Sequence, residues 1–288
     1  MLLGRRFWKM SGSGNDFVFF DAMLEPAGSL STPESIGRLC ERRTGVGADG
    51  VVFLEPHSSQ AFMMRYFNRD GSLAEMCGNA ALCSTRLARD LGIVGQGDFA
   101  FETVSGPVTG RFVDGEPEID MVPVTEMQSD YATDRLAREG RIGFARVGVR
   151  HLVVLVDDVR DVEVERRGRE LRLVPSLRDG ANANFVSKGA EGRWIIRTYE
   201  RGVEEETFAC GTGAVATAAL LTTWGLADGP VVLATRSGRD LTARVPALAE
   251  DHASAGELAP HEATARQANP PVLRGEGRIV FEGFLGEF

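Results

Sequence analysis

The chain has 288 residues, of which 43% are hydrophobic and 25% are charged, the usage of an ordinary globular protein. Its formal net charge of −9 disfavours a general nucleic-acid binder, which usually carries a basic face. No apolar stretch approaches the ~20 residues that cross a bilayer, and the first residues include no apolar secretion signal. Four cysteines in a chain of this length do not make a disulfide framework, so we expect a cytoplasmic protein.

Lysine is rare in this chain. Only Lys9 and Lys188 are lysines among the 32 Lys and Arg residues. A cofactor that forms a Schiff base, such as pyridoxal phosphate, therefore has two candidate anchors, and neither lies in a motif. We therefore expect no pyridoxal phosphate.

Short strand-like runs bounded by Gly, Asp and Asn are separated by a few helices, which predicts an α/β (α+β) fold. In chain order, the predicted strands are 16–22, 51–54, 63–67, 152–156, 194–199, a hairpin of 231–235 with 241–245, and 279–281. The predicted helices are 33–42, 79–91, 164–175 and 212–224. Residues 247–276 have no clean period and predict an exposed loop insertion, which contains His252 and His261.

A weak internal repeat is the most informative feature. The first copy has Asn68 at a strand end, then Cys77-Gly78-Asn79, then a helical stretch to Gly92; the second has Glu200, then Cys210-Gly211-Thr212, then a helical stretch to Gly225. In both copies the cysteine precedes the final glycine by 15 residues. The repeat predicts two pseudo-symmetric domains, each a mixed sheet wrapped around a central helix, with both cysteines at a cleft between them.

A cysteine at a helix start suits proton-transfer chemistry. The positive end of the helix dipole lowers a thiol pKa from ~8.5 towards neutrality. The unpaired N–H groups at Gly78–Asn79 and Gly211–Thr212 suit a carboxylate. Two thiols on opposite faces of one carbon supply the base and the acid that invert a stereocentre. The pattern therefore predicts that Cys77 and Cys210 act as a pair.

Several of these motifs also fit a purely structural role. Cys40 and Cys83 fit small core residues, and a zinc site at Cys77 and Cys83 lacks further ligands, so we expect no metal. A C-x-x-C redox pair is absent. The glycine-rich stretch 11–17 precedes a strand and does not open a helix, unlike a dinucleotide-binding loop. His151, before an apolar run, fits a core histidine as well as a site residue.

These motifs together resemble the diaminopimelate epimerase family. The matching stretches are S-G-S-G-N-D-F (11–17), G-V-G-A-D-G (45–50), N-R-D-G-S-L-A-E-M-C-G-N-A (68–80), H-L-V-V (151–154), N-A-N-F-V (182–186) and E-R-G-V-E-E-E-T-F-A-C-G-T-G-A (200–214). The resemblance implies a cofactor-independent isomerase that interconverts LL- and meso-2,6-diaminopimelate in lysine and peptidoglycan precursor biosynthesis. Its partner is a small amino-acid substrate, with no nucleic acid and no membrane.

The resemblance also implies roles for individual residues. For the LL substrate, Cys77 is the proton donor and Cys210 the acceptor, while His151 and Glu200 adjust their ionisation. The substrate ligands implied are Asn15, Asn68, Asn182, Glu200 and Arg201, with Gly78, Asn79, Gly211 and Thr212 around the reacting carboxylate. Arg201 is expected to pair with the distal carboxylate.

Several positions depart from the family pattern. They are Ser11 in place of His, Gly50 in place of Gln, Ala80 and Leu82 in place of Gly and Arg, and Val149-Arg150 in place of Asn-Pro. None touches the cysteine pair, but the last removes an expected contact to the distal end of the substrate, which Arg150 could replace.

Two alternative functions therefore stay open: a related two-cysteine racemase of another amino acid, of histidine or proline type, and a non-catalytic ligand-binding relative. We expect one lobe over 1–122 plus 277–288 and the other over 123–276. The sequence leaves the oligomeric state open, a homodimer included.

Overall fold

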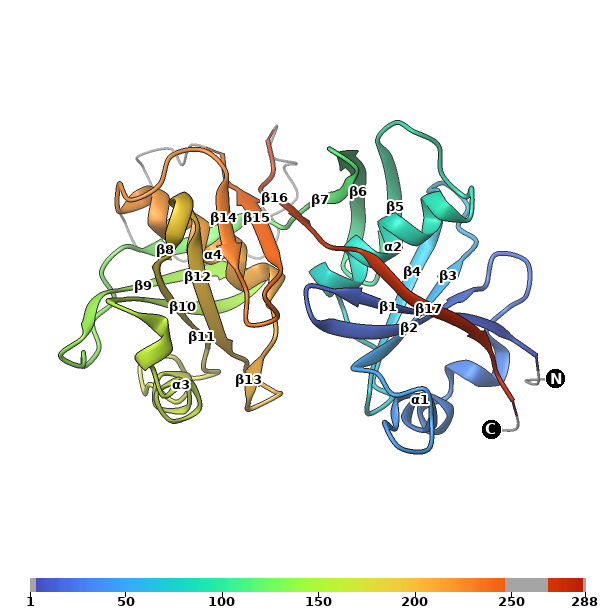
Figure 1. Cartoon of the computed structure of the whole chain (residues 1–288), viewed down its shortest axis with the longest axis horizontal. Helices are drawn as coiled ribbons and strands as arrows, with labels where there is room; N and C mark the ends of the chain where they lie inside the picture. The colour runs from blue at the N-terminus through green and yellow to red at the C-terminus, as the bar shows by residue number, and fades with distance from the viewer. Residues whose placement is uncertain (1–3, 247–268, 287–288) are drawn as a thin grey trace. The chain divides into compact units, whose positions relative to one another are not determined.

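The computed structural model of the chain describes residues 4–246 and 269–286 (Figure 1). The chain forms two compact units, Met1–Ile119 with Arg274–Phe288, and Asp120–Leu273. The two boundaries between the units, after residues 119 and 273, lie three residues before the boundaries expected from the sequence, after residues 122 and 276. His252, His261 and the segment 247–268 lie outside the described residues.

The first unit is a mixed sheet with two α-helices. Its elements are β1 (Arg6–Gly12), β2 (Asn15–Asp21), η1 (Gly28–Ser31), α1 (Pro33–Cys40), β3 (Gly50–Glu55), β4 (Met63–Asn68), α2 (Gly78–Asp90), β5 (Phe99–Thr103), β6 (Gly106–Val113), β7 (Glu116–Asp120) and β17 (Arg278–Phe284). Neighbouring strands pair in the order β17, β1, β2, β3, β4, β5, β6, β7.

The second unit repeats this design. Its elements are β8 (Val124–Gln128), β9 (Glu139–Val147), β10 (Val149–Val156), η2 (Val159–Asp161), α3 (Val164–Arg172), β11 (Asn182–Lys188), η3 (Ala190–Gly192), β12 (Trp194–Tyr199), β13 (Glu206–Thr207), α4 (Gly211–Thr223), β14 (Val231–Ala234) and β15 (Asp240–Arg244). Strands pair in the order β8, β9, β10, β11, β12, β14, β15, with β13 on the far end of β12.

The predicted duplication is confirmed by the strand directions. From β1 to β6 the successive pairings are antiparallel, parallel, antiparallel, parallel and antiparallel. From β9 to β15 the same five directions recur in the same order. In both units one helix follows the second of these strands and a 13-residue helix follows the fourth, so α1 corresponds to α3 and α2 to α4.

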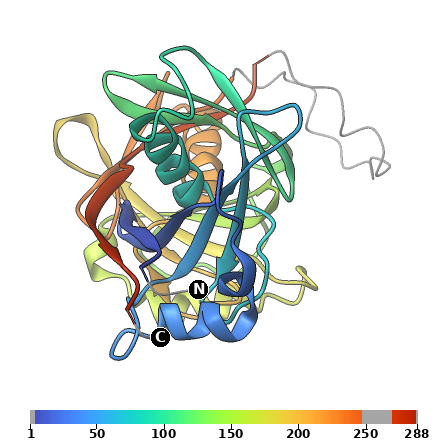
Figure 2. The ribbon, with the colours of Figure 1, turned by 90° about the vertical axis from the view of Figure 1, so that its right-hand side faces the viewer.

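Alternation along the strands places the two helices of each unit on opposite faces of its sheet, as Figures 1 and 2 show for α1 (blue) and α2 (teal). Val18 and Phe20 of β2 cluster with Ile36 and Leu39 of α1, whereas Phe17 of β2 belongs to the other face. In the second unit, Leu152 and Val154 of β10 and Phe185 of β11 cluster with Leu171 of α3. The central helix α2 contacts β1, β3, β4 and β6, and α4 contacts β8 to β11 and β15.

The sequence of α4 explains its central place. Every residue from 213 to 221 is buried, because a helix that is apolar on all sides needs cover on all sides. Gly143 of β9 allows the helix to lie close to the sheet, since a Cβ there would be only 2.6 Å from Leu220 Cδ2. Cys40 and Cys83 are buried, as predicted for core residues.

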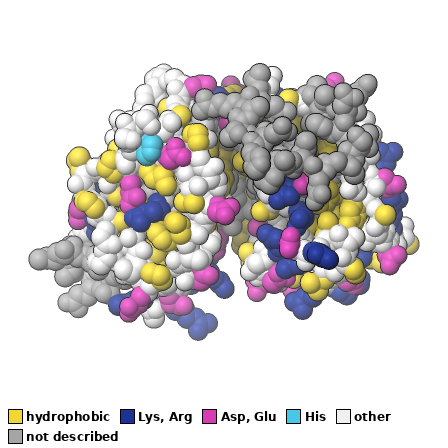
Figure 3. All heavy atoms as spheres, turned by 180° about the vertical axis from the view of Figure 1, so that it is seen from behind, with side chains coloured by type: hydrophobic (Ala, Val, Ile, Leu, Met, Phe, Trp, Pro, Cys, Tyr) yellow, Lys and Arg dark blue, Asp and Glu magenta, His cyan; other side chains and the backbone are white. Residues whose placement is uncertain are grey.

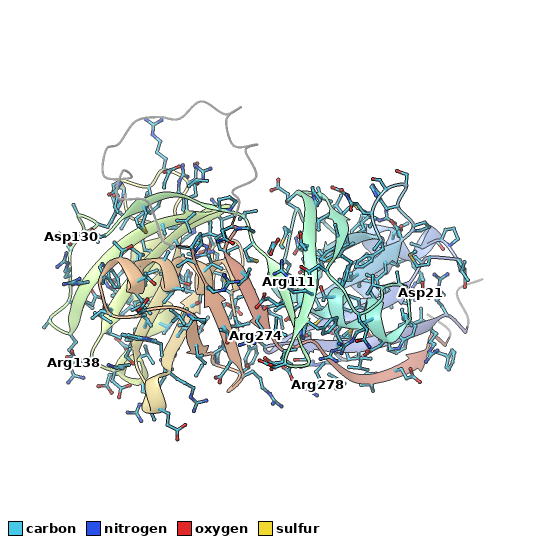
Figure 4. All side chains as sticks on the ribbon, turned by 90° about the horizontal axis from the view of Figure 1, so that it is seen from above. Asp21, Arg111, Asp130, Arg138, Arg274 and Arg278 are labelled. Atoms are coloured by element: carbon cyan, nitrogen blue, oxygen red, sulfur yellow. The ribbon has the colours of Figure 1, made fainter. Side chains whose placement is uncertain are left out.

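Charged side chains cover the outside of each unit. Arg111 Nε lies 3.2 Å from the exposed Asp98 Oδ2 in the first unit, and Arg138 Nη1 lies 2.5 Å from Asp161 Oδ2 in the second; both arginines are labelled in Figure 4. Acidic and basic groups are interspersed over the face in Figure 3. Within the described ranges, no helix combines the length and the apolar character needed to span a membrane.

The predicted helices and the predicted hairpin are confirmed to within a few residues at their ends. Several strands were not predicted: β1, β5 to β9, β11, β13 and β16 (Val272–Gly275). The last of these lies in the segment predicted as a loop. That prediction is wrong for 272–275, because two prolines precede a run whose Val272 and Leu273 are buried and which is too short to show a period.

Candidate active site

In the first unit, a tight turn brings Asn15 beside the start of α2. Ser13 and Gly14 both have positive φ, as a two-residue type I′ hairpin turn between β1 and β2 requires. Asn79 Nδ2 donates to Asn15 Oδ1 over 2.6 Å. Gly12 permits this contact, because a Cβ there would lie 2.8 Å from the Asn79 carbonyl oxygen. The first turn of α2 is thus held against the end of β1.

A charged cluster fixes Asn15 from the other side. Asn15 Nδ2 donates to Asp49 Oδ2 over 3.3 Å, and Asp49 also accepts from Arg42 over 2.7 Å. Arg42 and Lys9 both bind Asp16, and these contacts lower the pKa of Asp16 although burial opposes them. Burial, together with the Asp16 carboxylate, raises the pKa of Asp49. Asp49 was not predicted as a site residue, although it lies within a motif that carries the family resemblance.

Cys77 is the N-cap residue of α2, with an extended backbone (φ −138°, ψ 117°). Its side chain makes no capping hydrogen bond to the helix, and the first turn contains no acidic residue. The positive end of this helix is therefore not neutralised by its own first turn, which suits it to a carboxylate at Gly78 and Asn79. Asn68 ends β4, where its Nδ2 donates to Ser72 Oγ over 3.0 Å.

In the second unit, three predicted residues lie together at strand ends. His151 of β10 and Asn182 of β11 are direct neighbours in a parallel pair. Arg201 N donates to Asn182 Oδ1 over 2.8 Å, and Arg201 Nη1 donates to the Asp179 carbonyl over 3.0 Å. Arg150, expected to compensate for a missing Asn, is engaged by Asp179, with Nη1 and Oδ2 2.5 Å apart.

His151 is fully buried. Burial lowers its pKa to about 3, and the nearby Arg201 cation acts in the same direction. Its Nδ1 lies 3.2 Å from Asn184 Nδ2. The imidazole is therefore neutral over the ordinary pH range.

Glu200 and Cys210 frame the start of α4. Glu200 Oε1 accepts from Thr207 Oγ1 over 2.6 Å. Cys210 is the N-cap of α4, with φ −127° and ψ 111°, and its side chain makes no capping hydrogen bond. Cys210 Sγ lies 3.5 Å from Thr212 Oγ1. Both cysteines are half-buried, in contrast to Cys40 and Cys83.

The strand registers relate the two halves residue by residue. Phe17 pairs with Gly50 in the first unit as His151 pairs with Asn182 in the second. Val52 pairs with Tyr66 as Asn184 pairs with Thr198. Extending that register places Asn68 and Glu200 at matching strand ends, followed by matching helices capped by Cys77 and Cys210.

The structure thus assembles two half-sites. The first holds Asn15, Cys77, Gly78 and Asn79, with Asn68 at a strand end; the second holds His151, Asn182, Glu200, Arg201, Cys210, Gly211 and Thr212. That the two sulfur atoms share one pocket stays a prediction. Asn184 and Thr198 were missed, although Asn182 and Asn184 are two residues apart in one strand and so share a face.

Comparison with known proteins agrees with this arrangement. A family model described as diaminopimelate epimerase matches residues 7–126 and 143–248. A diaminopimelate epimerase of Gemmatimonas aurantiaca is 43% identical over 281 residues, covering 96% of this chain and 98% of the relative. The chain belongs to the diaminopimelate epimerase family. The predicted family and the predicted class of enzyme, an isomerase, are confirmed.

Solved structures share the fold at low identity. A phenazine biosynthesis protein of the PhzF family from Bacillus anthracis has a TM-score of 0.72 at 15% identity, covering 98% of both chains. A hydroxyproline epimerase from Agrobacterium vitis, with bound trans-4-hydroxy-L-proline, has a TM-score of 0.65 at 16% identity, covering 97% of this chain and 91% of that one. The predicted α/β fold with two similar mixed-sheet units is confirmed.

Proposed function

We propose that the protein interconverts LL- and meso-2,6-diaminopimelate without a cofactor, by two-base proton exchange between Cys77 and Cys210. The observation that carries the proposal is the duplicated geometry: in a member of this family, each unit places one half-buried cysteine at the N-cap of its central 13-residue helix. The reaction belongs to the biosynthesis of lysine and of peptidoglycan precursors.

One turnover leaves the total number of protons on the two cysteines unchanged. With the LL substrate, the Cys210 thiolate takes the α-proton and becomes a thiol, leaving a carbanion. The Cys77 thiol then gives its proton to the opposite face of the same carbon and becomes a thiolate. The reverse reaction exchanges these roles.

The carbanion needs stabilisation beside the thiols. In this proposal the reacting carboxylate accepts from the backbone N–H groups of Gly78–Asn79 and Gly211–Thr212. Neither helix carries an acidic residue in its first turn, so both positive ends favour the negative charge that develops. Glu200 and His151 adjust the ionisation of the thiols.

The two lysines fit a reaction without a Schiff base. Lys9 is buried and is bound by Asp16 Oδ2 at 2.6 Å and by the Gly47 carbonyl oxygen. Lys188 is exposed at the end of β11, the end opposite to Asn182. Neither is placed to hold pyridoxal phosphate beside the cysteines.

The far end of the substrate is assigned to polar residues at the strand ends. Asn15, Asn68, Asn182, Glu200 and Arg201 are the proposed ligands. Arg201 is exposed and provides the charge for a distal carboxylate, while its backbone is held by Asn182.

A substrate panel tests the proposal. The purified protein is incubated in D2O with LL-diaminopimelate and, separately, with L-histidine, L-proline and other L-amino acids. Deuterium should enter the α-position of diaminopimelate alone, and Cys77→Ala and Cys210→Ala should each abolish turnover. Exchange into another amino acid would favour the related racemase, and wild-type activity after either substitution would exclude the two-base scheme. Binding without exchange would indicate a non-catalytic relative.

The proposal also covers location and assembly. Four free cysteines agree with a reducing cytoplasm. A homodimer is proposed because, among the strands of the described ranges, β17 pairs with β1 alone in its unit and carries exposed Phe281 and Phe284. Light scattering on the eluted protein should give the mass of two chains; the mass of one chain would contradict the dimer.

A further inference from the structure

The amide of Asn184 has one possible orientation. Its nitrogen lies 3.0 Å from the carbonyl oxygen of Leu152, which can only accept, while its oxygen lies 3.0 Å from Thr198 Oγ1. Turning the amide over would set two acceptor oxygens against each other inside the protein, where an unsatisfied group costs about 1–3 kcal/mol. Both side chains are buried, so water does not replace these partners.

This orientation determines where His151 carries its proton. The Asn184 nitrogen also lies 3.2 Å from His151 Nδ1. Because that nitrogen is a donor, His151 Nδ1 must be the acceptor. A neutral imidazole with a bare Nδ1 holds its proton on Nε2. The buried Nε2 makes no hydrogen bond within 4–246 and 269–286.

The fold itself does not require the hydrogen-bonded row of His151, Asn184 and Thr198. The matching positions of the first unit are Phe17, Val52 and Tyr66, in the same strand registers. Phe17 and Val52 are as fully buried there as His151 and Asn184 are in the second unit. One copy of the duplicated frame therefore has aromatic and aliphatic side chains at these positions, whereas the other has a histidine, an asparagine and a threonine in a row. A structural role alone leaves that difference unexplained.

A glycine in α4 is adapted to the same amide. A Cβ on Gly213 would lie 2.3 Å from Asn184 Oδ1 and 3.3 Å from Cys210 Cβ. The matching residue of α2 is Ala80, which is also buried. Asn184 thus lies against the first turn of α4, the turn that Cys210 caps.

We propose that Asn184 is a positioning residue that holds His151 as the neutral tautomer with its proton on Nε2, so that His151 serves the site as a hydrogen-bond donor and not as a proton acceptor. The assignment deepens the proposed function and rests on it, because the group that accepts from Nε2 is a thiolate or the substrate carboxylate. The neutral form suits this task, since a buried, uncharged N–H stabilises a nearby negative charge without itself losing a proton.

The first test is spectroscopic and needs no substrate. Long-range 1H–15N correlation of the full chain at neutral pH separates the tautomers of each of the four histidines. The signal set lost in His151→Phe identifies this residue. A protonated Nε2 with a bare Nδ1 is the expected result. A proton on Nδ1, or on both nitrogens, would overturn the proposal whether or not the protein proves to be an epimerase.

Variants then connect the tautomer to activity. Asn184→Asp replaces the donor by an oxygen, so the His151 proton should move to Nδ1 and kcat should fall by about 100-fold or more with KM little changed. Thr198→Val removes the hydroxyl that donates to the Asn184 oxygen, while the Leu152 carbonyl still orients the amide, so it should cause a smaller fall. Ser187→Ala, a buried polar change in the same strand, is the control and should alter neither the spectrum nor kcat.

The outcomes separate the two proposals. Full activity in Asn184→Asp with a shifted proton would overturn the role given to Nε2. If Asn184→Asp does not fold, the spectra of the wild type and Thr198→Val decide the tautomer. The expected tautomer in a protein inactive on diaminopimelate would refute the proposed function while leaving the orientation of His151 by Asn184 in place.

Discussion

Gly213→Ala tests the packing beneath Cys210. Alanine is ordinarily the better helix former, by about 1 kcal/mol within a helix. Here the added Cβ would lie 2.3 Å from Asn184 Oδ1, whereas real Cβ contacts are essentially never under 3.0 Å. Asn184 or the first turn of α4 must therefore shift by at least 0.7 Å, the difference between these distances.

That shift is larger than the local hydrogen bonds can absorb. Asn184 is held by contacts of 3.0, 3.0 and 3.2 Å, so a displacement of this size breaks at least one of them. An unsatisfied buried polar group costs about 1–3 kcal/mol, and overpacking costs a similar amount. The strain outweighs the gain in helix propensity, and we expect a net loss of about 1–3 kcal/mol in the free energy of unfolding.

Urea unfolding of the wild type and Gly213→Ala measures this loss as a lower midpoint. Gly140→Ala is the matched control, because its Cβ would meet the Leu155 carbonyl oxygen at an ordinary 3.6 Å. The control should change the midpoint little. Gly213→Ala that is as stable and as active as the wild type would refute the packing described here.

The remaining predictions concern buried charge, pH and thiol reactivity. Glu139→Ala should lower the free energy of unfolding by about 1.5–3 kcal/mol, seen as a lower urea midpoint, because the buried Arg167 loses the carboxylate 2.7 Å away and keeps only that of Glu170 at 3.1 Å; a loss below about 1 kcal/mol would contradict this. As pH falls from 6.5 towards 3, His151 becomes protonated in the unfolded chain but stays neutral in the folded protein, where it is buried. The free energy of unfolding therefore falls by up to about 1.4 kcal/mol per pH unit. His151→Phe should make this pH dependence less steep, and an unchanged slope would contradict the prediction. Iodoacetamide at neutral pH should modify the two helix-capping cysteines first, because burial raises the pKa of Cys40 to about 12; peptide mapping that finds Cys40 modified first would refute the expectation. Oxidant should reduce activity and a reductant restore it, through a disulfide between the same two cysteines; failure of the reductant would argue that the sulfurs lie too far apart.

The helices were predictable because their ends are marked in the sequence. Helix α2 begins after Cys77 and ends before Gly92, whose φ of +73° suits a helix stop. Strand β9 was missed, because glycine and arginine interrupt the apolar residues of its sequence E-G-R-I-G-F-A-R-V. Its Gly143 is needed for close packing against α4, a helix far along the chain, so no local sequence pattern identifies it.

The site was predictable where motifs repeat and not where it depends on strand register. Two Cys-Gly helix starts at matching positions are visible in the sequence. Asn184 and Thr198 lie inside buried strands, and their contacts follow from the pairing of β10, β11 and β12. The amide that orients His151 therefore becomes evident only once those registers are known.

The fate of the α-proton tests the central claim most directly. The enzyme is given LL-diaminopimelate in D2O, and both isomers are analysed by mass spectrometry early in the reaction. Proton removal by one thiol and delivery by the other should place solvent deuterium in the meso product, while the remaining LL substrate keeps its own hydrogen. Meso product that retains the substrate's hydrogen would show that a single group serves both faces and would contradict the account.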